Sequence, residues 1–179
     1  PEERQQLEVL SKLSELARRQ QQVNERLREL QTALAAAEDE EERDKIRREL
    51  KRLEEEQRTM VTQMDEVQQR MDTLPQDREM RQAGEQLQEA REDMRNISES
   101  LQEEQVSQAL AAGSRAQENL EELKDEFKES TSSQFSESMR QVRDAARELA
   151  ENQRNISEEL DRLQNEIAPT LDGSGTRQE

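Results

Sequence analysis

The fold of this chain is decided first by residues 9–37, VLSKLSELARRQQQVNERLRELQTALAAA. Seam positions recur there at alternating steps of four and three residues, which is the spacing of a helix that buries one narrow stripe. The stripe consists of Val9, Leu13, Leu16, Gln20, Val23, Leu27, Leu30, Leu34 and Ala37. We therefore expect a long amphipathic helix with a heptad seam.

The same spacing returns after the acidic link Glu38–Glu42. Its members are Ile46, Leu50, Leu53, Gln57, Met60, Met64, Val67, Met71 and Leu74. Within the link, Asp39 followed by Glu42 is typical of a capping box that starts a helix. Because so short a link leaves the two helices side by side, residues 1–74 are expected to form an antiparallel helical hairpin.

Pro75 is expected to end the second helix, because proline disfavours helical conformation in the residue before it. Thr73 is a candidate cap for the helix that follows. Two further seams then occupy residues 80–101 and 106–127. Their members are Met80, Ala83, Leu87, Ala90, Met94, Ile97 and Leu101, then Val106, Ala109, Gly113, Ala116, Leu120, Leu123 and Phe127.

We expect residues 75–129 to form a second hairpin whose facing positions carry small side chains. In that hairpin Ala90 would meet Ala116, and Met94 would meet Gly113. Ala90, Gly113 and Ala116 are therefore candidates for close packing. A glycine inside a helix costs about 1 kcal/mol relative to alanine, so a break at Gly113 is the alternative.

Residues 130–134 are predicted to be a linker, because serine and threonine compete for the backbone hydrogen bonds of a helix. A fifth seam follows in residues 135–168, a C-terminal long helix, and residues 169–179 are predicted to be a disordered tail. The fifth seam consists of Phe135, Met139, Val142, Ala146, Leu149, Gln153, Ile156, Leu160, Leu163 and Ile167. The expected fold is all-α, with elongated antiparallel coiled-coil hairpins and about five helices.

Three glutamines, Gln20, Gln57 and Gln153, occupy seam positions where leucine or isoleucine would be usual. A polar seam residue lowers stability but can fix the register and the choice of partner helix. In the first hairpin the amides of Gln20 and Gln57 lie within reach of each other. The alternative is that each amide leaves the seam for the solvent-exposed rim.

The composition argues against most chemistry. The 179 residues include no Cys, His, Trp or Tyr, so the usual acid–base, nucleophilic and transition-metal residues are missing. We expect no catalytic, cofactor-binding or metal-binding residues. A net charge of −17 argues against nucleic-acid binding and against contact with anionic lipid. Because the chain begins with Pro1 rather than Met, we expect it to be cut from a longer protein.

The sequence resembles the helical regions of large bacterial membrane-anchored proteins of unknown function, of the proteobacterial and planctomycete type. In the matching pattern, glutamine-rich "L-A-x-x-Q" helices precede a hairpin rich in alanine. It is carried by Leu16, Ala17, Gln20, Ala90, Met94, Leu101, Ala109, Leu110, Ala116, Leu120, Leu123, Leu149, Ala150 and Gln153. The resemblance implies a parent tethered to a membrane by N-terminal helices that lie outside this chain, and it transfers no active-site residues.

Two hypotheses follow for function. In the first, the chain is a non-catalytic scaffold or spacer that binds a protein partner or a further copy of itself through its helix faces. In the second, it is a regulatory arm of a membrane-anchored or chromosome-segregation-like ATPase, although it lacks the phosphate-binding loop of such an enzyme. A pivot at Pro75 or in residues 130–133 would favour the second hypothesis.

Overall fold

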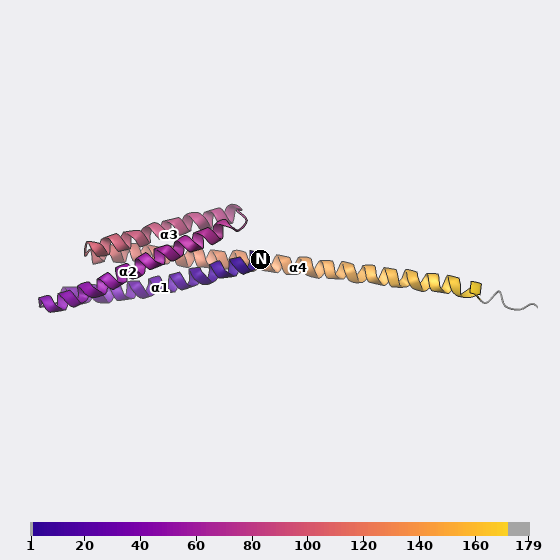
Figure 1. The fold of residues 1–179 in the computed structure, drawn as a ribbon, viewed down its shortest axis with the longest axis horizontal. Helices are drawn as coiled ribbons and strands as arrows, with labels where there is room; N and C mark the ends of the chain where they lie inside the picture. Colours follow the sequence, from indigo (N-terminus) through magenta and orange to yellow (C-terminus); the bar gives the residue numbers. More distant parts are fainter. Residues whose placement is uncertain (1, 172–179) are drawn as a thin grey trace, which may run out of the picture. The chain divides into compact units, whose positions relative to one another are not determined.

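A computed structural model of the chain describes the backbone of residues 2–171 and the side chains of residues 2–165 (Figure 1). The described backbone contains four helices and no strand, which confirms the all-α prediction. The helices are α1 (Glu2–Ala36), α2 (Glu40–Asp72), α3 (Arg78–Gln102) and α4 (Val106–Leu171). The predicted disordered tail falls largely on residues 172–179, which lie outside the described range.

The predicted start of α2 is confirmed. The Asp39 carboxylate accepts a hydrogen bond from the backbone N–H of Glu42 at 2.8 Å, and the Glu42 carboxylate accepts one from the N–H of Glu38 at 3.1 Å. The prediction that Thr73 caps α3 is wrong. Thr73 closes α2, because its N–H and hydroxyl donate to carbonyls of the last turn, and the cap of α3 is Asp77.

The turn between α3 and α4 contains a left-handed residue that is not glycine. Glu104 has a φ of 58°. Its N–H donates to the carbonyl of Leu101, and the N–H of Gln105 donates to the carbonyl of Ser100, which together form a Schellman motif. The sharp turn explains why the seam changes phase between Leu101 and Val106.

Residues 1–132 form a compact unit in which the two expected hairpins pack against each other as one four-helix bundle (Figure 1). Helix α1 lies beside α2 and also beside α4, where Asn24 donates to the carbonyl of Gly113 at 2.9 Å. Helix α3 lies beside α2, where Arg91 donates to Asp65 at 2.6 Å, and beside α4. Each helix therefore has two neighbours.

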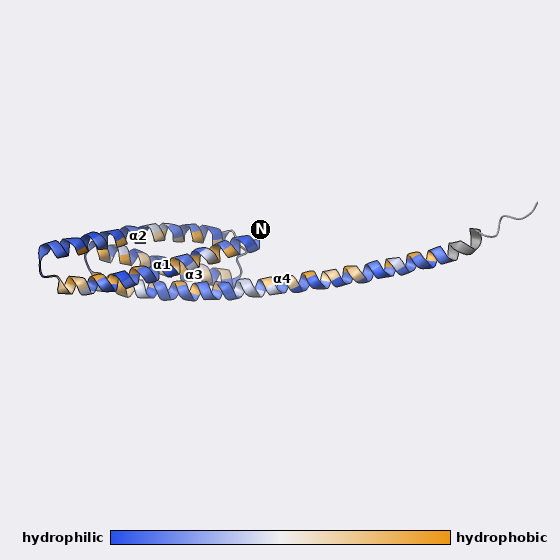
Figure 2. Cartoon of the chain, turned by 90° about the horizontal axis from the view of Figure 1, so that it is seen from below, coloured by the Kyte–Doolittle hydropathy of each residue, from blue (hydrophilic) through white to orange (hydrophobic). Residues whose placement is uncertain are grey.

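The core of this bundle consists of the seam residues of all four helices (Figure 2). Leu13, Met60, Leu87 and Leu120 come from the four different helices, and none is more than 1% exposed. Since each seam is buried by two neighbouring helices rather than one, burial extends beyond the seam to flanking positions such as Ala17 and Ala112.

The expected break in the helix at residues 130–134 is wrong, because α4 is helical from Val106 to Leu171, although the boundary between two compact units falls at residues 132 and 133. The expected fourth and fifth helices are therefore one helix. Serine and threonine lower helix propensity by only about half a kcal/mol each, and an established helix gains one backbone bond for each residue added. Gly and Pro are the least favourable residues in a helix interior, and α4 has neither between Ser114 and Ala168.

The second compact unit comprises residues 133–179. Its described part is the helical segment 133–171 of α4. The sequence placed the end of this helix at residue 168, before Pro169, whereas the helix extends to Leu171. A proline in the last turn removes only one backbone hydrogen bond, so the helix can continue for a few residues beyond the predicted end.

Candidate functional site

Three polar side chains lie completely inside the bundle. Gln20, Asn24 and Gln57 are each 0% exposed. The amide of Gln57 donates to Oε1 of Gln20 at 3.0 Å, and the amide of Gln20 donates to Oδ1 of Asn24 at 2.9 Å. The expectation that Gln20 and Gln57 reach each other is confirmed, and the alternative in which their amides leave for the rim is wrong, because both are fully buried.

Asn24 extends this network from α1 to α4. Its amide donates to the backbone carbonyl of Gly113 and to Oε1 of Gln117, both at 2.9 Å. We call Gln20, Asn24, Gln57, Gln117 and the Gly113 carbonyl the polar layer. It links three helices through hydrogen bonds at one level of the core, where buried polar groups must be paired to avoid a cost of about 1–3 kcal/mol each.

Gly113 is helical and buried, so the predicted alternative of a break at this residue is wrong. The expected role of Gly113 as space for Met94 is also corrected. A Cβ at residue 113 would overlap Oδ1 of Asn24, and would lie 3.1 Å from its Cγ and 3.4 Å from Nε2 of Gln20. The missing side chain therefore makes room for the polar layer.

The other close-packing candidates, Ala90 and Ala116, are both 0% exposed in the core. Their pairing with each other stays a prediction. Asn24 was missed by the sequence reasoning, because it lies next to the seam residue Val23 rather than on the seam. The available signals were an asparagine in a helix interior, four residues after Gln20, and a helical glycine in α4.

One acceptor of the polar layer is unsatisfied within the described residues. Oε1 of Gln57 is buried without a hydrogen-bond partner, as is the hydroxyl oxygen of Ser98 on α3. Gln57 also places its amide 3.8 Å from the sulfur of Met60. A buried, unpaired acceptor lowers the stability of the fold. The polar layer therefore makes the bundle less stable than a core of leucine at the same positions would.

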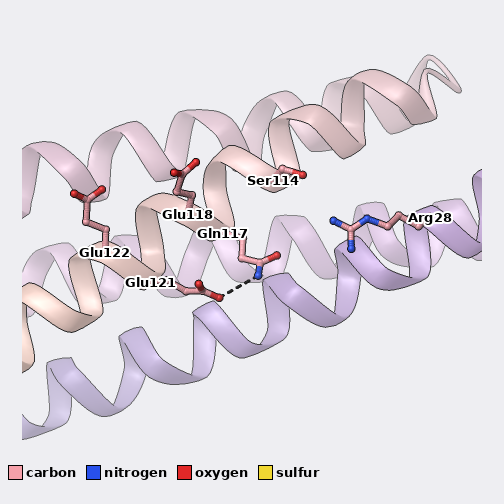
Figure 3. A pocket seen from close by; sticks show the side chains of 6 residues that line it. All are labelled: Arg28, Ser114, Gln117, Glu118, Glu121 and Glu122. Atoms are coloured by element: carbon pink, nitrogen blue, oxygen red, sulfur yellow. Dashed lines mark hydrogen bonds between the residues drawn. The ribbon is translucent and has the colours of Figure 1, made fainter.

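Gln117 connects the polar layer to a hollow on the surface of the bundle. The hollow is lined by Arg28, Ser114, Gln117, Glu118, Glu121 and Glu122. Figure 3 shows Gln117 and Glu121 pointing toward α1, joined by a hydrogen bond from the Gln117 amide to Oε1 of Glu121 at 3.0 Å. Its lining is dominated by solvated carboxylates, and no group of three metal-ligating residues is found in the part of the chain that the structure describes.

The ion pairs on the surface of the bundle link neighbouring helices and do not form a reactive site. Arg91 holds Asp65 through Nε at 2.6 Å and through a second nitrogen at 3.3 Å. This hydrogen bonding raises the pKa of Arg91, against the lowering effect of burial. Since arginine is already charged at any physiological pH, the shift creates no acid or base.

The second unit exposes an apolar face. We call Phe135, Met139, Val142, Ala146, Leu149, Gln153, Ile156, Leu160 and Leu163 the 135–163 stripe. Its seven large apolar members are between 49% and 64% exposed. Figure 2 shows apolar residues recurring along this part of α4. The structure brings Gln20 and Gln57 together, whereas Gln153 is exposed and its role in setting a register stays a prediction.

The stripe repeats a sequence that is buried in α1. Leu149-Ala150-x-x-Gln153-x-x-Ile156-x-x-x-Leu160 matches Leu16-Ala17-x-x-Gln20-x-x-Val23-x-x-x-Leu27. The α1 residues of this motif are at most 4% exposed. One heptad pattern thus occurs both as bundle core and as an uncovered helix face.

No helix among residues 2–171 is both long enough and apolar enough to cross a membrane. Comparison with family models, with curated proteins and with solved structures finds no match for this chain. The function is therefore argued from the polar layer and the 135–163 stripe.

Proposed function

We propose that this chain is a non-catalytic helical scaffold, in which a four-helix bundle carries a helix that binds another protein chain through the 135–163 stripe. The observation that supports this most directly is the contrast between the two copies of one motif. Leu16 and Val23 are buried by neighbouring helices, whereas Leu149 and Ile156 are about 60% exposed, at 62% and 59%. A contiguous exposed apolar face is typical of a protein interaction site.

The energetics favour a covered stripe. Fully burying a Val, Leu, Ile, Phe or Met side chain stabilises by roughly 1.5–3 kcal/mol, so covering a half-exposed one contributes about half of that. Charged residues lie on the other faces of the helix, as in the exposed ion pair between Arg140 and Glu137. We also propose that the helix pairs of this chain, α1 with α2 and α3 with α4, interlock as antiparallel coiled coils.

The proposal needs no chemistry from the chain, consistent with the missing His and Cys. From the resemblance, the scaffold would be one segment of a longer bacterial protein tethered to a membrane. The regulatory-arm alternative gains no specific support, because residues 130–133, where a pivot was expected, are helical.

Light scattering coupled to size exclusion tests the proposal on the full chain and on residues 1–132. We expect the full chain to associate and the bundle alone to be monomeric. In the variant Leu149→Glu/Ile156→Glu, association of the full chain should be lost. The control Gln141→Glu/Asn155→Glu adds the same charges to exposed positions off the stripe and should change nothing. Association that survives the stripe variant would contradict the proposal.

A further inference from the structure

The chain contains three copies of one motif, Leu-x-x-x-Gln-x-x-apolar-x-x-x-apolar. They occupy residues 16–27, 53–64 and 149–160. The first two copies cover each other in the bundle, where α1 and α2 run antiparallel. The third copy is the centre of the 135–163 stripe and is exposed.

The first two copies meet through their glutamines. Gln57 donates to Gln20 at 3.0 Å with both side chains fully buried. Beside this pair, a guanidinium nitrogen of Arg19 donates to Oε1 of Gln63 at 2.6 Å. The pair α1 and α2 therefore shows how two antiparallel copies of this motif pack against each other.

We propose that the third copy binds the third copy of a second chain in the same antiparallel geometry, with a two-fold axis close to Gln153. The inference rests on the proposed function, because it names the chain that covers the stripe. If the segment 133–171 of each chain takes the place of α1 or α2 in this pair, Leu149 lies opposite the partner's Leu160. The amide of Gln153 then lies within reach of the partner's Gln153.

The glutamine is the reason for choosing a second copy as the occupant. Gln153 is the one polar residue of the 135–163 stripe, and once covered it needs a hydrogen-bonding group at its own level. An apolar partner surface would leave the amide unpaired. A second copy supplies the matching amide through symmetry, as Gln57 supplies it to Gln20 in the bundle.

The charges beside the stripe are compatible with this pairing. The positions of Arg19 and Gln63 in the bundle correspond to Asn152 and the partner's Glu159, so an amide would donate to a carboxylate. On the other flank, Arg143 lies opposite the partner's Gln164. No two like charges face each other at these positions, although the whole chain carries a net charge of −17.

The covered area is adequate for a stable pair. Five large apolar residues of each chain, from Val142 to Leu163, lie within the overlap. At roughly 60–120 Å² for each, they contribute about 300–600 Å² per chain. With the polar flanks, this approaches the roughly 800 Å² per partner of a standard interface.

Distances between spin labels on the full chain test the geometry. The chain has no cysteine, so Glu137→Cys and Asn165→Cys each give one labelled site. At 1.5 Å per residue, a two-fold axis midway between Leu149 and Leu160 separates the two labels at residue 137 by about 52 Å and the two labels at residue 165 by about 32 Å. In a parallel in-register pair the two labels lie at the same level, so both sites give short distances of about 20 Å or less across the pair.

The variant Gln153→Glu tests the glutamine contact. It places two carboxylates together at neutral pH, so we expect dimer affinity to fall by at least about tenfold. Gln141→Glu makes the same change on the far side of the helix and should leave affinity unchanged. Helix content from circular dichroism should be the same for both variants.

Short distances at both sites, equal distances at both sites, a trimer, or a monomeric full chain would each overturn the antiparallel dimer. Loss of association in Leu149→Glu/Ile156→Glu with a different geometry would overturn this inference and keep the proposed function. Association that persists in that variant would contradict both.

Discussion

Replacing Gly113 with alanine tests whether the polar layer controls the stability of the bundle. In an ordinary helix interior this change stabilises by about 1 kcal/mol. Here the added methyl group would overlap Oδ1 of Asn24 and lie 3.1 Å from its Cγ. We therefore expect the opposite sign.

The magnitude follows from the hydrogen bonds that Asn24 would lose. Displacing its carboxamide breaks the bonds to the Gly113 carbonyl and to Gln117, and strains the bond from Gln20, all at 2.9 Å. Leaving two buried polar groups unpaired costs about 1–3 kcal/mol each. After subtracting the gain in helix propensity, Gly113→Ala should lower the free energy of unfolding by about 1–5 kcal/mol.

Gly84→Ala is the matched control. Gly84 is also helical, and a Cβ there would lie 3.6 Å from the nearest atom, Nε2 of Gln68, which is an ordinary contact. This variant should stabilise by up to about 1 kcal/mol. Urea unfolding of residues 1–132, followed by circular dichroism, would place the midpoints of the two variants on opposite sides of the parent.

The double variant Asn24→Ala/Gly113→Ala separates the clash from other effects. Without the Asn24 carboxamide, adding the methyl group at residue 113 should be neutral or stabilising relative to Asn24→Ala alone. If Gly113→Ala raised the unfolding midpoint as Gly84→Ala does, the polar layer would not be formed as described, and the argument built on it would be refuted.

Three further predictions concern local features of the bundle, and urea unfolding of the same fragment checks each. Glu104→Gly should stabilise by about 1 kcal/mol, because glycine adopts the left-handed φ of 58° without strain, and the exposed ion pair to Arg47 that it loses contributes little; a destabilised variant would contradict this. Gln20→Leu and Gln57→Leu should each cost about 1–3 kcal/mol, whereas the double variant should cost less than the sum, and additive costs would indicate that the two amides are not coupled. Asp39→Ala should cost about 1 kcal/mol through the lost cap of α2, while Asp44→Asn, one turn into the helix, should cost less than half of that; equal effects would show that the cap is not formed.

The helices and most of the core were predictable from the sequence because heptad spacing is a local signal. Leu13, Met60 and Leu120 are buried because their spacing places them on one face of a long helix. The contact of Gln20 with Gln57 was predictable too, since a short link fixes the register of a hairpin. The packing of the two hairpins against each other was not, because each seam alone is compatible with a simple pair of helices.

Positions beside the seams carried the missing information. Asn24 is buried where a third helix, α4, covers it, and a rule based on seam spacing gives it no weight. The helix through residues 130–134 was missed for a different reason. Four weak helix formers in a row suggest a break, but the propensity difference of each is small beside the gain from continuing a helix.

The polar layer also explains why a seam of nearly interchangeable apolar residues settles in one arrangement. A slip of α2 by one heptad would keep apolar residues facing apolar residues, so the core alone discriminates weakly against it. The same slip would place Gln57 away from Gln20 and leave two buried amides unpaired, at a cost of roughly 2–6 kcal/mol. Asn24 and Gly113 extend this selection to α4, because the carboxamide fits only where the opposing helix has no side chain. Because Gln153 lies on the 135–163 stripe, any helix that covers the stripe must likewise offer a hydrogen-bonding group at the level of this amide.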